Sequence, residues 1–291
     1  MREVKTIGFI GVGVMGKSMV RNLMKNGFDV SIYTRTKSKV EDVIAEGAKW
    51  CGTVAECAAG RDCVITIVGF PKDVEEVYFG EGGIIASASE GAVLIDMTTT
   101  SPALDQKIYA AAKERGIDVL DAPVSGGDVG AQNGTLAIMV GCDKEVFEEC
   151  MPVFSAMGTN IRYEGASGAG QHTKMANQIA LAGALAGTCE ALAYARAAGL
   201  DEKTVLDTIS TGAAGSWQMT NNGYKILEGN YDPGFFTAHF IKDMKIAVEE
   251  AKERDMELPV LEDVLAQYEK LSADGGDLLG TQALIKVYDG R

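Results

Sequence analysis

Short apolar runs alternate with segments of helical periodicity through the first half of the chain. The runs typical of buried strands span residues 6–10, 29–34, 63–68, 92–96, 119–124 and 136–140. Between them lie segments such as residues 17–26, which place apolar side chains on one helical face. Near-continuous apolar strands indicate a parallel sheet that is buried on both faces. The alternation therefore predicts an α/β fold with a doubly wound parallel sheet.

The second half of the chain, from Gly165 onward, shows helices and turns without strand alternation. An uncharged run from Met175 to Cys189 continues as a helix to about Ala198, and Gly199 follows, as is typical of a helix end. We expect a central helix of roughly 40–45 Å here. The pattern predicts an α/β domain over residues 1–164 and an all-helical substrate and dimerisation domain over residues 165–291, joined by this long helix.

The composition is that of a soluble globular protein of about two domains. The chain has 291 residues, of which 46% are hydrophobic and 23% charged, and its net charge of −14 argues against a nucleic-acid-binding surface. Its 6 cysteines form no CxxC pair, so we expect reduced thiols in a cytoplasmic protein. The N-terminal residues lack the apolar core of a signal peptide, and no uncharged run reaches the length of a membrane span, so no membrane contact is expected.

A glycine-rich turn, Gly11-Val-Gly13-Val-Met-Gly16, directly follows the first predicted strand and opens a helix. Its glycines allow a tight turn and let a pyrophosphate approach the helix N-terminus. In this context the motif favours a Rossmann dinucleotide-binding domain over a glycine-rich turn of an unrelated α/β fold. The residues expected at the pyrophosphate are Gly11, Val12, Gly13, Val14, Met15 and Gly16.

The end of the second predicted strand carries Thr34, Arg35, Thr36 and Lys39, with no carboxylate before Glu41. An NAD site usually has an acidic residue here, which accepts a hydrogen bond from the ribose 2′-hydroxyl. Such an acid would repel a 2′-phosphate, whereas an arginine binds phosphate and stacks on adenine. The segment therefore favours NADP(H) over NAD(H), and a solvated basic turn is the alternative interpretation.

Two further segments lie where a ligand would bind. Gly69 ends the strand 63–68, at the carboxyl edge of the sheet where dinucleotides lie. Ser125, Gly126 and Gly127 follow the strand 119–124 and offer a hydroxyl and unobstructed backbone N–H groups, which suit a small carboxylate. Taken alone, this second segment is more typical of an ordinary turn.

Lys174 lies just before the uncharged run, with Asn177 on the same helical face. A lysine at the edge of a buried helix is costly unless it is paired or used. The alternative is a surface lysine whose stem packs along the helix. The lysine alone does not decide between these two interpretations.

Four motifs in this order resemble the β-hydroxyacid dehydrogenase family, which includes 3-hydroxyisobutyrate dehydrogenase, tartronate semialdehyde reductase and the glyoxylate and succinic semialdehyde reductases. They are the segments 8–16, 121–127 and 168–178 and the pair Lys242-Asp243. The resemblance runs almost end to end, and four ordered motifs are far more specific than one. One departure is the segment 279–282, where family members often carry an Asp and a Ser that this chain lacks, which leaves the preferred substrate open.

The resemblance implies that Lys174 is the catalytic acid and base, that Asn177 helps to hold the substrate, and that residues 125–127 bind its carboxylate. Hydride then moves between the nicotinamide and the substrate carbon that bears the oxygen. In reduction the Lys174 ammonium group protonates the developing alkoxide, and in oxidation the neutral amine takes the hydroxyl proton.

The same resemblance implies that Val68 and Thr98 line the nicotinamide half of the NADP site, and that Lys242 reaches the cofactor or active site from the helical domain. No metal is expected, because the two histidines, His172 and His239, belong to no cluster of metal-ligand spacing.

We expect an NADP(H)-dependent oxidoreductase that reduces a small aldehyde acid (succinic semialdehyde, glyoxylate or tartronate semialdehyde) or oxidises a hydroxy acid of the 3-hydroxyisobutyrate type. The alternatives are a non-catalytic dinucleotide-binding regulatory protein and an enzyme similar to 6-phosphogluconate dehydrogenase. A regulatory protein would need neither Lys174 nor the turn at Ser125. The 6-phosphogluconate dehydrogenases have a much longer helical domain and must bind a phosphate. The glycine- and alanine-rich central helix indicates a subunit interface, so we expect a homodimer or homotetramer.

Overall fold

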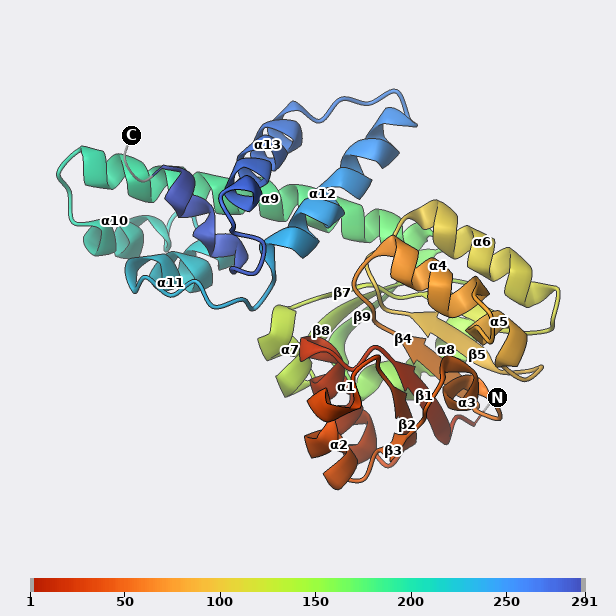
Figure 1. Ribbon diagram of the computed structural model, residues 1–291. Coiled ribbons are helices and arrows are strands. Elements are labelled where there is room, and N and C mark those ends of the chain that lie inside the picture. The colour runs from red at the N-terminus through yellow and green to blue at the C-terminus, as the bar shows by residue number, and fades with distance from the viewer. Residues whose placement is uncertain (1–2, 289–291) are drawn as a thin grey trace. The chain divides into compact units, whose positions relative to one another are not determined.

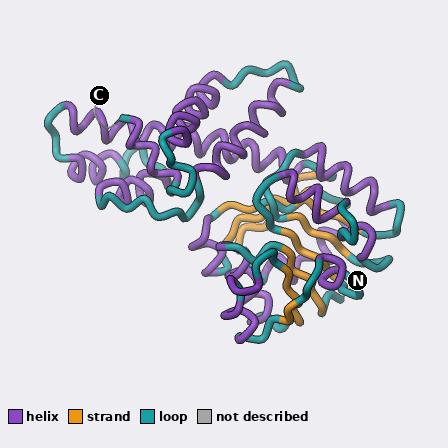
Figure 2. Tube along the Cα trace, viewed as in Figure 1, coloured by secondary structure: helices purple, strands orange, loops and turns teal. Residues whose placement is uncertain are grey.

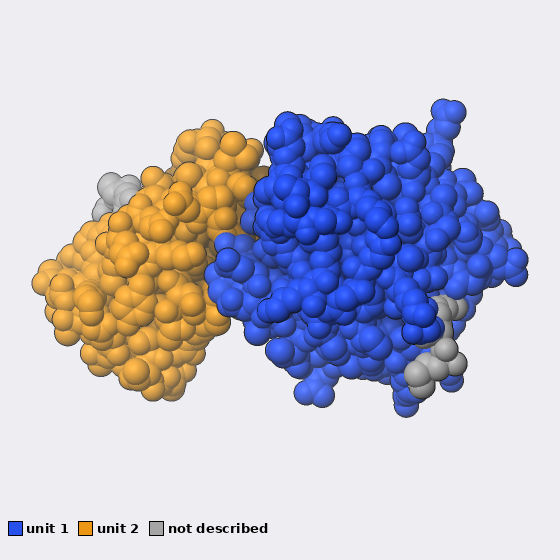
Figure 3. Space-filling model, turned by 90° about the horizontal axis from the view of Figure 1, so that it is seen from below, with its two compact units in different colours: residues 1–174 blue, residues 175–291 orange. Residues whose placement is uncertain are grey.

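The computed structural model describes residues 3–288, and the chain forms two compact units, Met1–Lys174 and Met175–Arg291 (Figure 3). The sequence pattern places a domain boundary after residue 164, one residue before the end of the last strand. The division between the compact units falls further along the chain, within helix α9 (Ala169–Ala197), whose residues up to Lys174 belong to the first unit and whose later residues belong to the second.

The first unit is built on one sheet (Figures 1 and 2), with the strand order β3-β2-β1-β4-β5-β6-β8-β7 and with β9 beside β8. Within residues 3–288 its strands are β1 (Thr6–Ile10), β2 (Asp29–Tyr33), β3 (Lys49–Trp50), β4 (Cys63–Thr66), β5 (Val93–Asp96), β6 (Asp118–Asp121), β7 (Val124–Ser125), β8 (Leu136–Gly141) and β9 (Gly158–Gly165). All neighbouring pairs from β3 to β6 are parallel. The chain order reverses between β1 and β4, which is where open α/β sheets bind their ligands.

Two details of the sheet differ from the expectation of a parallel sheet whose last clear strand spans 136–140. That strand, β8, runs antiparallel to β6 and β7, so the sheet is dominated by parallel pairs without being wholly parallel. Strand β9 follows it, parallel to β8, and was not predicted. The reason is that most side chains of β9 are exposed at the sheet edge, so the strand lacks the apolar run that marks the buried strands.

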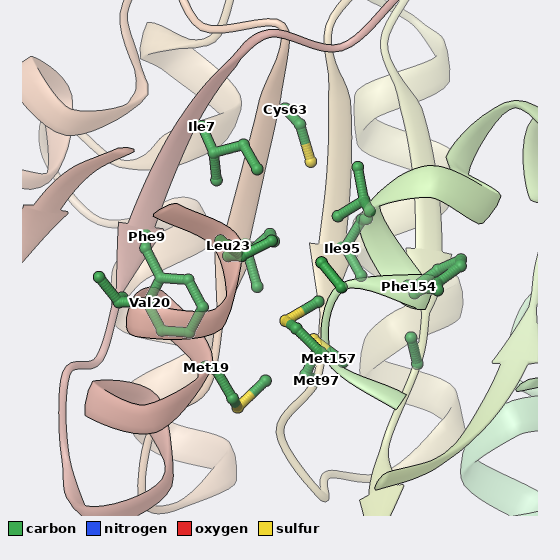
Figure 4. Packing of buried hydrophobic residues seen from close by; sticks show 14 of the residues in the cluster. Ile7, Phe9, Met19, Val20, Leu23, Cys63, Ile95, Met97, Phe154 and Met157 are labelled. Carbon is green, nitrogen blue, oxygen red and sulfur yellow. The ribbon is translucent and has the colours of Figure 1, made fainter. Parts of the chain in front are cut away.

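Helices cover both faces of this sheet. They are α1 (Val14–Lys25), α2 (Glu41–Ala45), α3 (Val54–Ala58), α4 (Pro71–Phe79), α5 (Ile84–Ser87), α6 (Pro102–Lys113), α7 (Gly127–Asn133) and α8 (Lys144–Ser155), with a 3₁₀ turn at Lys37–Lys39. Successive strand residues point to opposite faces. Phe9 therefore packs with Met19 and Leu23 of α1 in one core (Figure 4), while Ile10 packs with Tyr78 of α4 in the other. This confirms the doubly wound arrangement.

The second unit is helical. Besides the greater part of α9, it contains α10 (Glu202–Ile209), a π-helical turn (Gln218–Gly223), α11 (Tyr224–Leu227), α12 (Thr237–Lys252), α13 (Pro259–Ala273) and a 3₁₀ helix (Thr281–Val287). Across the described residues 175–288 no strand forms beyond one isolated bridge between Phe236 and Gly280. Its core gathers side chains such as Leu185, Phe240 and Tyr268. The helical character predicted for the C-terminal part of the chain is confirmed over these described residues.

Helix α9 has 29 residues and is therefore about 43 Å long. It ends before Gly199, which has φ +72°, while Leu200 N donates to Ala195 O at 3.0 Å. This glycine closes the helix because a left-handed residue there costs little without a Cβ. Over residues 3–288, no helix is both long and apolar enough to cross a membrane.

Candidate active site

The glycine-rich turn between β1 and α1 leaves one open surface. Gly11 has φ +102°, and a Cβ there would lie 2.1 Å from Ile67 O, so the position excludes a side chain. A Cβ at Gly16 would lie 2.3 Å from Gly11 O. At Gly13, by contrast, a Cβ would meet nothing within 4 Å. Gly13 is the N-cap of α1, whose first turn holds no acidic residue, so this helix end fits a pyrophosphate.

The side chains of the turn divide between core and surface. Val12 is buried, Met15 packs against the core, and Val14 is exposed. Val12 and Met15 therefore hold the turn in place, and they offer a ligand their backbone rather than their side chains. The six predicted pyrophosphate contacts are contiguous, but they are not equivalent.

The carboxyl ends of β1, β4 and β5 bring four predicted cofactor residues together. Val68 N donates to Thr98 Oγ1 at 3.0 Å, which joins the segments that follow β4 and β5. A Cβ on Gly11 would lie 3.1 Å from Val68 Cγ1, so the glycine-rich turn borders the same place. Gly69 follows, half-buried. These residues lie where the strand order reverses, as a dinucleotide site requires.

Arg35, after β2, has an acidic partner that the local sequence does not reveal. Its Nη2 lies 2.7 Å from Asp73 Oδ1, and its side chain remains 74% exposed while that of Asp73 is 8% exposed. Asp73 lies in the first turn of α4, where its other oxygen accepts a hydrogen bond from Phe70 N at 3.0 Å. The neighbouring Thr36 and Lys39 are exposed. A carboxylate thus lies beside Arg35, the residue predicted to bind the 2′-phosphate, although no acidic residue lies between Thr34 and Glu41 in the chain.

Lys174 lies beside the Ser125-Gly126-Gly127 turn. Its side chain is buried, at 6% exposure, and Nζ donates to Val124 O at 2.8 Å. Gly126 and Gly127 have φ +128° and +65°, conformations that favour glycine, and a Cβ at Gly127 would meet nothing within 4 Å. The structure therefore joins the predicted acid/base residue to the predicted carboxylate turn, and it rejects the surface-lysine interpretation.

The first turn of α9 is held by Asp121, a residue that sequence reasoning did not include in the site. Its carboxylate oxygens accept from Gly168 N at 2.7 Å and Gln171 N at 2.9 Å, so a side chain at the end of β6 caps this helix. Burial raises the pKa of the Asp121 carboxyl to about 6, against the opposing effect of these donors. In the sequence, the signal that could have identified Asp121 is an acidic residue at the end of a buried strand.

Gln171, one turn before Lys174, was also missed. Its side chain is fully buried, its Nε2 donates to Thr98 O at 2.8 Å, and its Oε1 accepts from Thr100 N at 3.2 Å. These bonds tie the loop after β5 to the helix that carries Lys174. The sequence around Gln171, which precedes His172, gives no signal of this role.

Asn177 and Lys242 are linked within the second unit. Asn177 Nδ2 donates to Gln178 Oε1 at 2.7 Å, and Gln178 Nε2 donates to Asp243 Oδ2 at 2.6 Å. Lys242 Nζ lies 2.9 Å from the other oxygen of Asp243, which is buried. Two predicted site residues therefore share one polar chain, in which Gln178 and Asp243 are the connecting members.

The divergent segment 279–282 is packed within the second unit. Gln282 is 2% exposed, and its Nε2 donates to Asn230 O and Asp232 O at 3.1 Å each. It therefore braces the loop before α12. In the part of the chain from 3 to 288, no three His, Cys, Asp or Glu side chains gather as metal ligands. All six cysteines lie in this part, where each is a buried thiol.

Two family models match the chain in succession. The model described as the NAD binding domain of 6-phosphogluconate dehydrogenase matches residues 6–165. The model described as NAD-binding of NADP-dependent 3-hydroxyisobutyrate dehydrogenase matches residues 168–288. Together they cover both compact units.

Individual proteins resemble the chain over nearly its whole length. It is 56% identical to an uncharacterized oxidoreductase of Bacillus subtilis (strain 168), YkwC, over 98% of this chain and 99% of that protein. It is 36% identical to the NAD-dependent L-serine dehydrogenase of Pseudomonas aeruginosa, over 98% of each. The crystal structure of 3-hydroxyisobutyrate dehydrogenase from Salmonella typhimurium matches with a TM-score of 0.89 at 28% identity, over 97% of this chain and 99% of that one. The chain belongs to the β-hydroxyacid dehydrogenase family, and it is an oxidoreductase that binds a nicotinamide dinucleotide.

Proposed function

We propose that the protein transfers a hydride between NADP(H) and a small β-hydroxy acid or its aldehyde acid, with Lys174 as general acid and base. The observation that carries this proposal is the position of Lys174 Nζ, buried and 2.8 Å from Val124 O, beside Ser125. Burying an ammonium group is unfavourable unless its protons have partners or a use. At a turn that offers donors to a carboxylate, the group is placed to give a proton to a substrate oxygen.

Lys174 and the residues of the turn have separate roles in this proposal. In reduction, Lys174 donates a hydrogen bond to the aldehyde oxygen and then its proton to the substrate alkoxide. In oxidation, the neutral amine accepts the hydroxyl proton. Ser125 Oγ and the backbone N–H groups of Gly126 and Gly127 hold the carboxylate. A bound nicotinamide dinucleotide supplies or accepts the hydride.

The residues that would hold this dinucleotide are the glycine-rich turn, with its open surface at Gly13, and the joined pair Val68 and Thr98. We further propose that Asn177 orients the substrate and that Lys242 acts at the cofactor or active site. The support for these two roles is the family resemblance and the polar chain that holds both side chains.

The compounds named for two similar proteins suggest the substrate class. Both 3-hydroxyisobutyrate and L-serine carry a hydroxymethyl group on the carbon next to the carboxylate. We propose that the substrates of the present chain share this feature. They are then 2-substituted 3-hydroxypropionates and their semialdehydes, including tartronate semialdehyde. Succinic semialdehyde and glyoxylate place the reacting carbon at other distances from the carboxylate.

A turnover panel tests the proposal, with NADPH and NADH for the aldehyde acids and with NADP+ and NAD+ for the hydroxy acids. We expect the highest kcat/KM with tartronate semialdehyde, 3-hydroxyisobutyrate or L-serine, and a value at least about 10-fold lower with succinic semialdehyde or glyoxylate, because a fixed carboxylate site misplaces their reacting carbon. A preference for glyoxylate or succinic semialdehyde would contradict the substrate class. Dinucleotide binding without turnover of any member would contradict the activity, and turnover of 6-phosphogluconate would favour the other enzyme class.

We propose NADP(H) as the preferred cofactor, and Arg35 carries this part of the argument. Its guanidinium is exposed, follows β2 without a local acid, and is held by Asp73 at 2.7 Å. The ion pair leaves most of the guanidinium surface open to a phosphate. Family membership alone does not determine whether NADP(H) or NAD(H) is preferred, since the L-serine dehydrogenase of Pseudomonas aeruginosa is named as NAD-dependent.

Replacing Arg35 by alanine is expected to lower kcat/KM for NADPH by about 10- to 100-fold, the value of one or two charge-assisted hydrogen bonds. The efficiency with NADH should change by less than about 3-fold, since NADH has no 2′-phosphate. Steady-state kinetics with varied cofactor measure both values. Lys37→Ala is the matched control, because Lys37 lies in the same turn, carries the same charge and rests over the ring of Trp50. Equal losses with NADPH and NADH in Arg35→Ala would contradict the assignment.

We also propose a cytoplasmic homodimer or homotetramer. The support is the glycine- and alanine-rich sequence of α9 and the 74% exposure of Tyr194 on that helix. Small residues and exposed aromatic side chains suit a contact between subunits.

A further inference from the structure

Three carboxyl groups are buried together in the first unit. Asp96 at the end of β5, Asp105 in α6 and Asp121 at the end of β6 are each at most 1% exposed. Burying several carboxylates in one place is strongly unfavourable unless each is well bonded or neutral. Their hydrogen-bond partners therefore indicate which of them carries a proton.

Two of the three groups accept hydrogen bonds as carboxylates do. Asp121 accepts from the backbone of the first turn of α9, as described above. Asp96 Oδ1 accepts from Thr66 Oγ1 at 2.8 Å and from Thr98 N at 2.9 Å. Donors from Thr66 and Thr98 favour the ionised form of Asp96.

Asp105 has different surroundings. Its Oδ2 accepts from Gln171 Nε2 at 2.7 Å, whereas among residues 3–288 no N–H or hydroxyl group donates to its buried Oδ1. The side chains of Asp105 and Asp96 nevertheless lie close enough to interact. Two carboxyl groups can share a hydrogen bond only when a proton lies between them. Burial and the negative charges of Asp96 and Asp121 raise the pKa of Asp105 well above its usual range.

The other titratable groups that face this pair supply no positive charge. Tyr78 on α4 hydrogen-bonds Thr66 at 3.0 Å and interacts with both acids, and burial raises the pKa of its hydroxyl well above the usual value. Cys63 on β4 lies near Tyr78. The acid pair is therefore stabilised by its shared proton and by neutral donors.

Gln171 connects the pair to the helix of Lys174. Its two amide protons go to Asp105 Oδ2 and Thr98 O, and its Oε1 accepts from Thr100 N. With all its polar side-chain groups bonded, the amide has one orientation. We infer that Asp105 is a neutral carboxylic acid that shares its proton with Asp96, and that it is a positioning residue: through Gln171 it holds the Thr98–Thr100 segment and the first turn of α9. The catalytic consequence of this inference rests on the proposed role of Lys174, but the shared proton does not.

The shared proton has a consequence for stability. The unfolded chain releases the Asp105 proton above about pH 4, while the folded chain keeps it. Folding then binds a proton, so the free energy of unfolding falls as pH rises, up to the folded-state pKa. Asparagine at position 105 keeps both hydrogen bonds, because its oxygen accepts from Gln171 and its amide donates to Asp96, yet it does not titrate.

Melting temperatures of wild type and Asp105→Asn, measured without cofactor or substrate, test the proton. The difference, variant minus wild type, should grow by about 5 °C or more between about pH 5 and about pH 8. Titrations of groups that do not interact with Asp105 are common to both chains and cancel, and Asp96 and Asp121 face a neutral side chain at position 105 in both. A difference that stays constant within about 1 °C over this range, or that falls, would overturn the shared proton. This result is independent of any substrate, so it is separate from failure of the proposed function.

Kinetics test the positioning role. Asp105→Asn should retain kcat within about 3-fold of wild type, whereas Asp105→Leu and Gln171→Met should lower kcat by about 10-fold or more, with smaller changes in KM, because misplacing Lys174 acts mainly on the chemical step. Gln171→Met leaves the acid pair in place and decides the outcome where Asp105→Leu fails to fold. Wild-type kcat in folded Gln171→Met would overturn the positioning role. Inactivity of the wild type itself on every acid of the panel would instead count against the proposed function.

Discussion

Replacement of Lys174 by methionine is expected to lower kcat by about 1,000-fold, within the range that a general acid or base contributes. Methionine keeps a long, flexible stem in the buried position but has no proton to transfer, and the hydrogen bond to Val124 O at 2.8 Å is lost. Turnover of the best acid of the panel measures the effect. A variant that retains more than about a tenth of wild-type kcat would refute the role of Lys174.

Lys174→Arg is the matched control. Arginine preserves the positive charge and the donors but stays protonated at every accessible pH. It should therefore also lose at least about 100-fold in the oxidative direction, which separates proton transfer from charge alone. The dissociation constant of the dinucleotide should change by less than about 3-fold in both variants, because Lys174 is assigned to the substrate.

Gly170→Ala is expected to lower the free energy of unfolding by about 3 kcal/mol, the upper range for overpacking a buried site. An added Cβ would lie 2.4 Å from Met139 O and 2.7 Å from Asp121 O, and both are backbone atoms that cannot turn aside. The first turn of α9 would have to move away from β6 and β8. Urea unfolding without cofactor measures the loss.

Gly13→Ala is the control for that experiment, since it also places alanine at the start of a helix in the first unit. There a Cβ would meet nothing within 4 Å, and the backbone φ of −84° suits alanine. Its free energy of unfolding should match that of wild type within about 0.5 kcal/mol. Equal midpoints for Gly170→Ala and wild type would show that the α9 terminus is not tightly packed against the sheet.

The fold class and the dinucleotide turn could be predicted from the sequence because their signals are local. A strand buried on both faces must be apolar along its whole length, as residues 63–66 are. A turn such as Gly11 excludes side chains by direct contact with backbone, so its composition is restricted. Strand β9 had no such signal, because exposed edge residues such as those around Arg162 tolerate polar side chains.

The candidate site was predicted in part. Lys174, Ser125 and the glycines that follow were identified by type and order, and the structure brings them together. The antiparallel course of β8 was not predictable, because strand direction depends on pairing between segments far apart in the chain.

The layered α/β architecture, the glycine-rich turn, the long helix and the residue types available for chemistry follow from the sequence alone, because periodicity and backbone conformation act over a few residues. The partners of those residues depend on the folded structure. Asp73 lies 38 positions from Arg35, and Asp105 lies 66 positions from Gln171. Asp105 lies in the first turn of α6, a position where acidic side chains are favourable at the surface, but it is fully buried. Its protonation depends on burial and neighbouring charge, which exist only once the chain has folded.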